Sequence, residues 1–258
     1  MSPGPEGATV DENVTRGHYD RLAATYDENW AHTPGFVEWM TSRIRQRLRI
    51  ADGDLVADIG CGTGLYARGL VPPAAAVVCA EPSQALLAQV PAEERLIPVA
   101  ASAEDLVAER VVLPHAGYDA IVLKEVLHHV AGQAAVIAGL ARLLRPGGGM
   151  LVVMLPTRIS YPLFAAALDL FAAQQPDPAD VVDQMRAAGL RTESACESFP
   201  LAFPAERYLQ MVRNRYMSLL SHFDDAQLEA GVAEIRMAHP GGQIEFADTF
   251  AFILGTAP

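Results

Sequence analysis

Short, continuously apolar segments alternate with helical patterns through the middle of the chain. The segments "DLVADIG", "AAVVCAEPS", "ERLIPVAAS", "YDAIVL" and "MLVVMLP" have the length and composition of buried strands. Strands that lack polar alternation are typical of a parallel sheet covered by helices on both faces. The pattern therefore predicts an α/β unit with five parallel strands.

The pattern differs on either side of this unit. Residues 13–48 have the spacing of two amphipathic helices, and "PTRISYPLFAAALDLFAAQ" and "DPADVVDQMRAAGL" predict two more after the fifth strand. A strand is expected in "RTESACESFP", followed by a long helical stretch over 204–238. The last segment, "GGQIEFADTFAFILG", predicts a strand with two different faces, because apolar residues alternate at Ile244, Phe246, Phe250, Phe252 and Leu254.

Composition and charge narrow the function classes. The chain has 258 residues, 51% of them hydrophobic, and a formal net charge of −12. It can bury a core, and its acidic surface argues against nucleic acid and anionic membranes as partners. No apolar run is long enough to span a bilayer, and "MSPGPEGATVDEN" lacks the pattern of a signal peptide. The three cysteines form no CxxC pair, so neither a zinc site nor a disulfide framework is indicated, and a cytoplasmic location is expected.

The most informative stretch is "VADIGCGTGLY", where a strand runs into glycines at alternate positions and then into a helix. Glycine lets a backbone turn sharply and approach a ligand closely, and the helix start offers free N–H groups. A P-loop would need GxxxxGK[ST], which is absent. A relaxed dinucleotide pattern, GxGxxA, fits from Gly62 to Ala67. The third alternative is an acidic residue two positions before the first of three glycines, which "DIGCGTG" provides at Asp58.

With this motif the chain resembles the class I S-adenosylmethionine (SAM) dependent methyltransferases. The resemblance runs from about residue 15 to 155 and rests on five motifs in order: "DIGCGTG", "CAEPS", "ASAEDL", "YDAIVLKEVLHHV" and "LARLLRPGGGMLVV". It implies an α/β fold with a Rossmann-like, seven-stranded, mostly parallel sheet, helices on both faces and a helical lid. The implied division is a disordered tail (1–12), a helical cap (13–50), the SAM-binding core (51–203), the lid (204–238) and a terminal antiparallel strand (239–258).

The resemblance also implies a cofactor site without a metal. Ligands of open α/β sheets bind at the carboxyl ends of the strands, and SAM would bind there. Glu81 would accept hydrogen bonds from both ribose hydroxyls of SAM. Asp58 would organise the glycine loop and bind the ammonium group, and the N-terminal helix would fold over SAM. The expected cofactor-binding residues are Tyr19, Tyr26, Asp58, Gly60, Gly62, Gly64, Glu81, Pro82, Ser102, Ala103, Glu104 and Lys124.

Two residues are candidates for catalysis. An acceptor hydroxyl or ammonium must lose a proton, and a base with a pKa near neutral helps. His128, in "VLKEVLHHV", is the predicted base, because a His at this pair can serve as one in related small-molecule enzymes. Tyr216 lies in the 204–223 helix that we expect to help build the acceptor site. Lys124 is the only lysine of the chain, and its role stays open.

The leading hypothesis is in-line methyl transfer from SAM to a small-molecule acceptor, with natural products included. An alternative keeps SAM but cyclises it by attack of its own amine on Cγ, which gives azetidine-2-carboxylate and methylthioadenosine. A SAM-binding regulatory protein and a dehydrogenase are further alternatives. The pattern does not name the acceptor or the oligomeric state.

Overall fold

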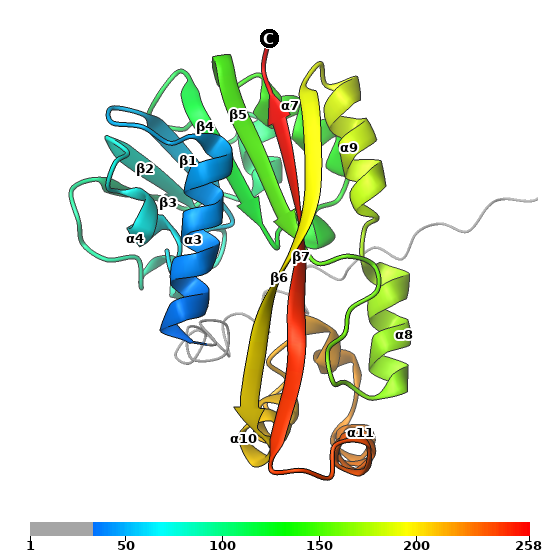
Figure 1. Cartoon of the computed structure of the whole chain (residues 1–258). Coiled ribbons are helices and arrows are strands. Elements are labelled where there is room, and N and C mark those ends of the chain that lie inside the picture. The colour runs from blue at the N-terminus through cyan, green and yellow to red at the C-terminus, as the bar shows by residue number, and fades with distance from the viewer. Residues whose placement is uncertain (1–32) are drawn as a thin grey trace, which may run out of the picture.

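The computed structural model describes residues 33–258, which form one seven-stranded sheet with helices on both faces (Figure 1). The strand order is β3-β2-β1-β4-β5-β7-β6, and only the contacts of β7 are antiparallel. This is the predicted fold class. The strands are β1 (Leu55–Ile59), β2 (Ala76–Ala80), β3 (Leu96–Val99), β4 (Tyr118–Lys124), β5 (Leu144–Met154), β6 (Arg191–Pro204) and β7 (Gln243–Thr256).

Two hydrophobic layers separate the sheet from its helices. Alternate residues of β4 serve both layers: Val122 packs on the α3 side, whereas Ile121 and Leu123 pack on the α7 and α9 side. Figure 1 shows α3 across the near face and α7 and α9 behind the sheet. The helices are α3 (Pro34–Leu48), α4 (Ala67–Leu70), α5 (Gln84–Leu87), α6 (Ala103–Val107), α7 (Gln133–Ala141), α8 (Ala165–Gln174), α9 (Pro178–Ala187), α10 (Ala205–Arg213) and α11 (Asp225–Ala238), with the 3-10 turns η2 (Leu127–His129) and η3 (Ser218–His222).

Strands β6 and β7 form a hairpin that runs well beyond the rest of the sheet. They pair over 14 residues each, but β7 pairs with β5 only from Ala251 to Thr256. The free half of the hairpin carries α10 and α11 at the lower end of Figure 1. The near layer of core continues from the sheet into these helices, with Tyr208 and Ile235 buried in it. Helices α10 and α11, in the segment predicted as a lid, are therefore part of the same hydrophobic core as the sheet.

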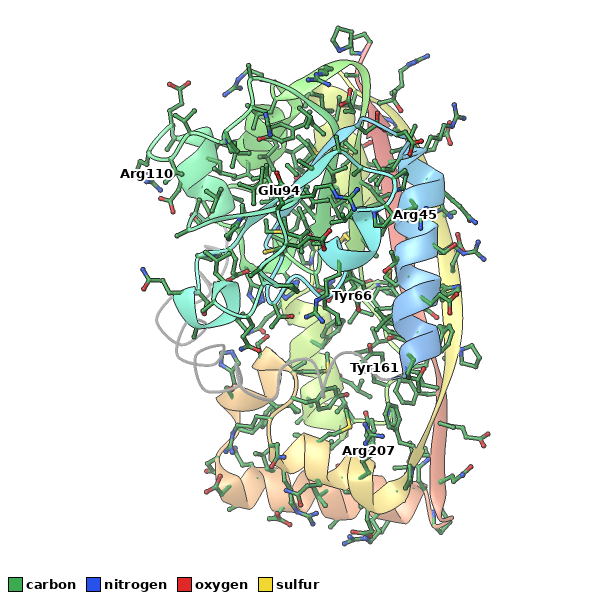
Figure 2. All side chains as sticks on the ribbon, turned by 90° about the vertical axis from the view of Figure 1, so that its left-hand side faces the viewer. Arg45, Tyr66, Glu94, Arg110, Tyr161 and Arg207 are labelled. Carbon is green, nitrogen blue, oxygen red and sulfur yellow. The ribbon has the colours of Figure 1, made fainter. Side chains whose placement is uncertain are left out.

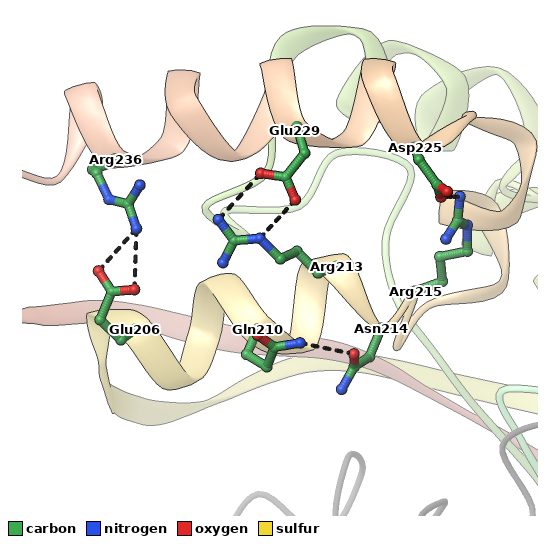
Figure 3. A network of polar contacts seen from close by, with 8 residues as sticks. All are labelled: Glu206, Gln210, Arg213, Asn214, Arg215, Asp225, Glu229 and Arg236. Carbon is green, nitrogen blue, oxygen red and sulfur yellow. Dashed lines mark hydrogen bonds and ion pairs between the residues drawn. The ribbon is translucent and has the colours of Figure 1, made fainter.

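Ion pairs connect α10 to α11 on the outer surface (Figure 3). Arg213 makes a bidentate contact with Glu229, at 2.7 and 3.2 Å, and Arg236 reaches Glu206 at 2.9 Å. Exposed pairs of this kind contribute little to stability, typically below about 1 kcal/mol each. The buried apolar face must therefore supply most of the energy that holds the two helices together.

The structure corrects three expected element boundaries. The predicted helix over 204–223 ends at Arg213, because Arg215 adopts a left-handed conformation (φ 54°) and donates to the Phe223 carbonyl and to Asp225. The predicted helix over 156–174 begins only at Ala165. The fifth strand, expected in "MLVVMLP", already begins at Leu144, and the "RPGGG" stretch lies within it as an irregularity between the partners of Tyr118 and Ala120.

No helix within residues 33–258 combines the length and the apolar character needed to cross a bilayer. The domain boundaries stay a prediction, and the tail and most of the helical cap lie outside the described residues.

Candidate active site

The loop after β1 takes a path that requires glycine. Gly60, Gly62 and Gly64 have φ values of 72°, 57° and 73°, which is the left-handed region that favours glycine. A Cβ on Gly60 would also lie 2.5 Å from a methyl group of Val126. The loop is therefore fixed by its alternate glycines, and it lies at the carboxyl edge of the sheet, as the sequence indicates.

Glu81 ties this loop to the end of β2. The N–H of Gly62 donates to Glu81 Oε2 at 3.1 Å, and the N–H of Ser83 donates to Oε1 at 2.9 Å. The side chain is buried, and this burial raises the pKa of Glu81 although both N–H groups act in the opposite direction. A carboxylate held in this way, beside glycine backbone, suits a diol or another multiple hydrogen-bond donor.

Asp58 and Lys124 face one another across neighbouring strands. Asp58 is 4% exposed, and burial raises its pKa to about 7, against the pull of the Lys124 charge. Burial likewise lowers the pKa of Lys124. The Lys124 ammonium lies 4.8 Å from the ring centre of Tyr66 and 5.3 Å from that of Phe250. Two aromatic faces thus help to stabilise a buried cation.

The residues after β3 have side chains that already serve the local structure. Ser102 begins α6 with a capping box, in which its hydroxyl accepts from the N–H of Asp105. Glu104 Oε1 accepts from the N–H of Ala131, and Ala103 is buried. Pro82 is exposed directly after Glu81. A cofactor role for these four residues rests on their position at the same edge of the sheet.

Glu125 connects the ends of β4 and β5. Its Oε1 accepts from the N–H of Leu155 at 2.7 Å, and its backbone has a φ of 56°, which is unusual for a residue with a side chain. Burial raises the pKa of Glu125 to about 7. A carboxylate with this pKa can exchange a proton near neutral pH.

The two histidines are in contact with one another on η2. Their ring centres are 3.9 Å apart, and burial, followed by the charge of Lys124, lowers the pKa of His128 to about 4. The imidazole of His128 is therefore neutral at pH 7 and a weak base. Sequence reasoning assumed a pKa closer to neutral for this residue.

Tyr216 lies under the lid, not on its surface. It is 1% exposed, and its hydroxyl lies 3.0 Å from that of Tyr208. Burial raises the pKa of Tyr216, so the phenol stays protonated at neutral pH and is not a base, and either it or the Tyr208 hydroxyl donates in their contact.

Sequence reasoning missed a buried Tyr161–Asp248 pair. The hydroxyl of Tyr161 donates to Asp248 Oδ1 at 2.7 Å, and Asp248 is fully buried on β7. One signal was present in the sequence: Asp248 interrupts the apolar alternation of the last strand. Tyr161 gave no such signal, because it lies 87 positions away in the loop after β5.

The structure also brings Cys61 and Cys79 together. A hydrogen bond from Cys79 and burial raise the pKa of Cys61. Such a buried thiol is a poor nucleophile. Within residues 33–258, no cluster of three or more His, Cys, Asp or Glu side chains has an arrangement suited to a metal ion. The predicted residues Tyr19 and Tyr26 lie outside the described part of the chain.

These residues fit SAM as cofactor. The glycine loop leaves backbone free of Cβ atoms, and two buried carboxylates, Asp58 and Glu81, stand beside it at the ends of adjacent strands. A cationic ligand with an ammonium group and two ribose hydroxyls matches this combination of charge and hydrogen-bond acceptors.

Comparisons with known proteins agree with this geometry. A family model described as "Methyltransferase domain" matches residues 57–152. A ubiquinone biosynthesis O-methyltransferase from Agrobacterium fabrum is 28% identical over 183 residues, which cover 64% of this chain and 72% of the relative.

Solved structures share the fold at low identity. A putative methyltransferase from an antibiotic biosynthesis pathway of Anabaena variabilis aligns with a TM-score of 0.64 at 18% identity and covers 84% of this chain and 96% of its own. The 4+2 cyclase SpnF aligns with a TM-score of 0.66 at 16% identity and covers 100% of this chain and 99% of its own. The family match shows a methyltransferase domain over residues 57–152, and the relatives and the sheet order make the chain similar to the class I methyltransferases that use SAM as cofactor.

Proposed function

We propose that this methyltransferase acts on a small-molecule acceptor, natural products included, by in-line displacement. The main support is the position of α10 and α11, the predicted lid. These helices share one hydrophobic core with the sheet and lie beyond its carboxyl edge. Helices in this position can shield a bound cofactor and a small acceptor from water and keep them aligned, as methyl transfer requires. The net charge of −12 supports an acceptor other than a polyanion.

The cofactor-binding roles are part of this proposal. Glu81 holds the ribose hydroxyls, and Asp58 with Gly60, Gly62 and Gly64 holds the methionine moiety. SAM supplies an electrophilic methyl group when bound. Pro82, Ser102, Ala103, Glu104 and Lys124 border the same edge. Tyr19 and Tyr26 are assigned to the cofactor site by the family resemblance alone.

An acceptor hydroxyl or ammonium must transfer its proton to a base when it is methylated. His128 is neutral at pH 7 and can accept it, but a pKa of about 4 makes this imidazole a weak base. Glu125, with a pKa of about 7, is the better matched acceptor of a proton. Tyr216 contributes a phenol hydroxyl, hydrogen-bonded to that of Tyr208, on the side of the predicted lid.

The experiment is an incubation of the purified protein with SAM, with and without pooled small molecules. We expect S-adenosylhomocysteine to form only when an acceptor is present. Methylthioadenosine accumulating from SAM alone would contradict methyl transfer and favour intramolecular cyclisation of SAM. A variant that lacks the Glu81 carboxylate serves as the inactive control.

A further inference from the structure

We infer that the ammonium of Lys124 binds an ionised oxygen of the acceptor, so that the acceptor is a phenol or a carboxylic acid that reacts as its anion. This inference rests on the proposed function and names its substrate class. It also gives a role to the only lysine of the chain, which the sequence leaves open.

The ammonium of Lys124 has no polar partner within residues 33–258. It forms neither a hydrogen bond nor an ion pair there, and its contacts are the ring faces of Tyr66 and Phe250, at 4.8 and 5.3 Å from the ring centres. Aromatic faces stabilise the positive charge of an ammonium, but they do not replace acceptors for its three N–H groups. These donors are therefore available to a ligand.

The ammonium also stays within reach of solvent. Lys124 is partly exposed, and its nitrogen is not among the polar atoms that the described part of the chain encloses without a partner. The same holds for the carboxylate oxygens of Asp58, which accept no hydrogen bond from a described residue. A ligand at the carboxyl edge can therefore reach both charged groups.

Lys124 and Asp58 lie on the same face of the sheet. Asp58 pairs with Val122, and Val122 belongs to the hydrophobic layer on the α3 side, as Phe250 does. Because side chains alternate along a strand, Lys124, two positions after Val122, points to that face as well. The same layer continues into α10 and α11. The ammonium therefore lies on the side of the sheet to which the predicted lid belongs.

The two rings place the ammonium between the cofactor side and the side of the predicted lid. Tyr66 follows the glycine loop, whereas Phe250 belongs to β7, whose first half extends to α10 and α11. In Figure 2 the labelled Tyr66 lies above Tyr161 and Arg207, the latter on α10. A group bound to Lys124 would thus have SAM at the glycine loop on one side, as transfer between two bound molecules requires.

An anion agrees with the charges around Lys124. Burial lowers the pKa of Lys124, and the carboxyl groups of Glu125, Asp248 and Asp58 act against this effect. None of the three forms an ion pair with the ammonium. Asp58 and Glu125 have pKa values of about 7, so each carries only part of a negative charge at neutral pH. Because a charge removed from water is costly without a partner in contact, an ionised oxygen of a ligand would stabilise this ammonium.

The transfer step balances when the acceptor is an anion. The acceptor loses its proton before the transfer, to solvent or to Glu125. A lone pair of its oxygen then forms the new O–C bond while the S–C bond breaks, and the electron pair of that bond stays on sulfur. The sulfonium and the oxyanion become a thioether and a methyl ether or ester, both uncharged at the reacting atoms. Such an acceptor needs no strong base during transfer, which agrees with the weak basicity of His128.

The test compares three probes of similar size on protein saturated with S-adenosylhomocysteine: phenylacetate, 2-phenylacetamide and 2-phenylethylamine. Calorimetric titration of the wild type at neutral pH should show phenylacetate binding at least about tenfold more tightly than the other two. Lys124→Met keeps an unbranched side chain beside the two rings but removes the charge, and it should abolish this preference. Arg45→Met removes a cation from the exposed side of α3 and should leave the preference intact.

A second titration distinguishes the acceptor from the carboxylate of SAM itself, the other ionised oxygen at this edge. If Lys124 bound that carboxylate, Lys124→Met would weaken S-adenosylhomocysteine binding but not binding of methylthioadenosine, which lacks the amino-acid moiety. We expect Lys124→Met to bind S-adenosylhomocysteine within about threefold of the wild type. A larger loss, confined to S-adenosylhomocysteine, would assign the ammonium to the cofactor and overturn the inference.

The remaining outcomes separate the inference from the proposed function. A wild type that binds the amide or the amine as tightly as phenylacetate, or none of the three, overturns the inference, and so does a Lys124→Met protein that keeps the preference. If Lys124→Met does not fold, the ranking of the probes on the wild type decides alone. A wild type that ranks the probes as expected but never converts SAM to S-adenosylhomocysteine would contradict the proposed function instead.

Discussion

The ionisable residues buried at the carboxyl edge are costly to fold. Asp58 and Glu125 have pKa values of about 7, which means that burial strongly disfavours their charged forms. An apolar core would avoid this cost, yet both residues lie close enough to Lys124 to interact with its charge. Residues with strongly shifted pKa values cluster at functional sites, so we interpret the carboxyl edge of the sheet as the functional site.

Glu81 offers the sharpest single-residue prediction. Glu81→Gln should weaken SAM binding by at least about tenfold, because an amide loses the charge-assisted acceptance of two hydroxyl donors. The melting temperature without ligand should change little. Calorimetric titration with SAM measures the effect, and Glu94→Gln, at an exposed carboxylate, is the control. Equal affinity in both variants would remove Glu81 from the site.

The raised pKa of Glu125 predicts that the free energy of unfolding depends on pH. Its folded pKa of about 7 exceeds the ordinary 4.5, so the native state binds the proton more tightly than the unfolded chain does. The stability that this group contributes is present in full below about pH 4.5 and is lost as the pH rises through about 7. Glu125→Gln cannot ionise and should escape this loss, which amounts to roughly 2–3 kcal/mol.

Urea unfolding of both proteins between about pH 5 and about pH 8 measures this difference. The wild type should lose more free energy of unfolding than the variant over that range. Parallel curves for the two proteins would show that Glu125 is not a buried acid. Asp58 titrates in the same range, so some pH dependence should remain in the variant.

At the scale of elements, α11 is the part of the lid with the clearest local signal. Asp224 accepts from the N–H of Gln227, and the Gln227 side chain accepts from the N–H of Asp224 in return. Leu228, Val232 and Ile235 then bury one face of the helix. The cap and the apolar periodicity agree at this helix start, and both are visible in the local sequence.

Asp224→Ala should lower the free energy of unfolding by about 1 kcal/mol, since it removes a capping acceptor at the start of α11. Asp224→Ser keeps a capping oxygen and should lose less. Chemical unfolding of the two variants checks this prediction. If both variants lost the same amount, the cap would not be what fixes the start of α11.

The neighbouring segment shows where local patterns fail. The apolar spacing of 204–223 fits one continuous helix, yet the chain leaves the helical path at Arg215. The guanidinium of Arg215 is held by the Phe223 carbonyl and by Asp225, and these contacts exist only in the folded lid. Tertiary contacts outweigh propensity here, so no local pattern could have revealed the break.

At the scale of the whole molecule, the sheet could be predicted and the acceptor side could not. Apolar runs predict the strands, and the glycine motif predicts a cofactor site at their carboxyl ends. The Tyr161–Asp248 pair depends on a contact between a loop and a strand that are 87 residues apart. Lys124 illustrates the same limit: its position at the end of β4 was clear, but the two rings that surround its ammonium come from the loop after β1 and from β7.

The most direct measurement of the central claim follows the methyl group itself. The protein is incubated with SAM that carries a deuterated methyl group together with an acceptor that supports S-adenosylhomocysteine formation, and both products are quantified by mass spectrometry. Methyl transfer predicts one deuterated methyl group on the acceptor for each S-adenosylhomocysteine formed. Label retained in methylthioadenosine, with no deuterium on the acceptor, would contradict it.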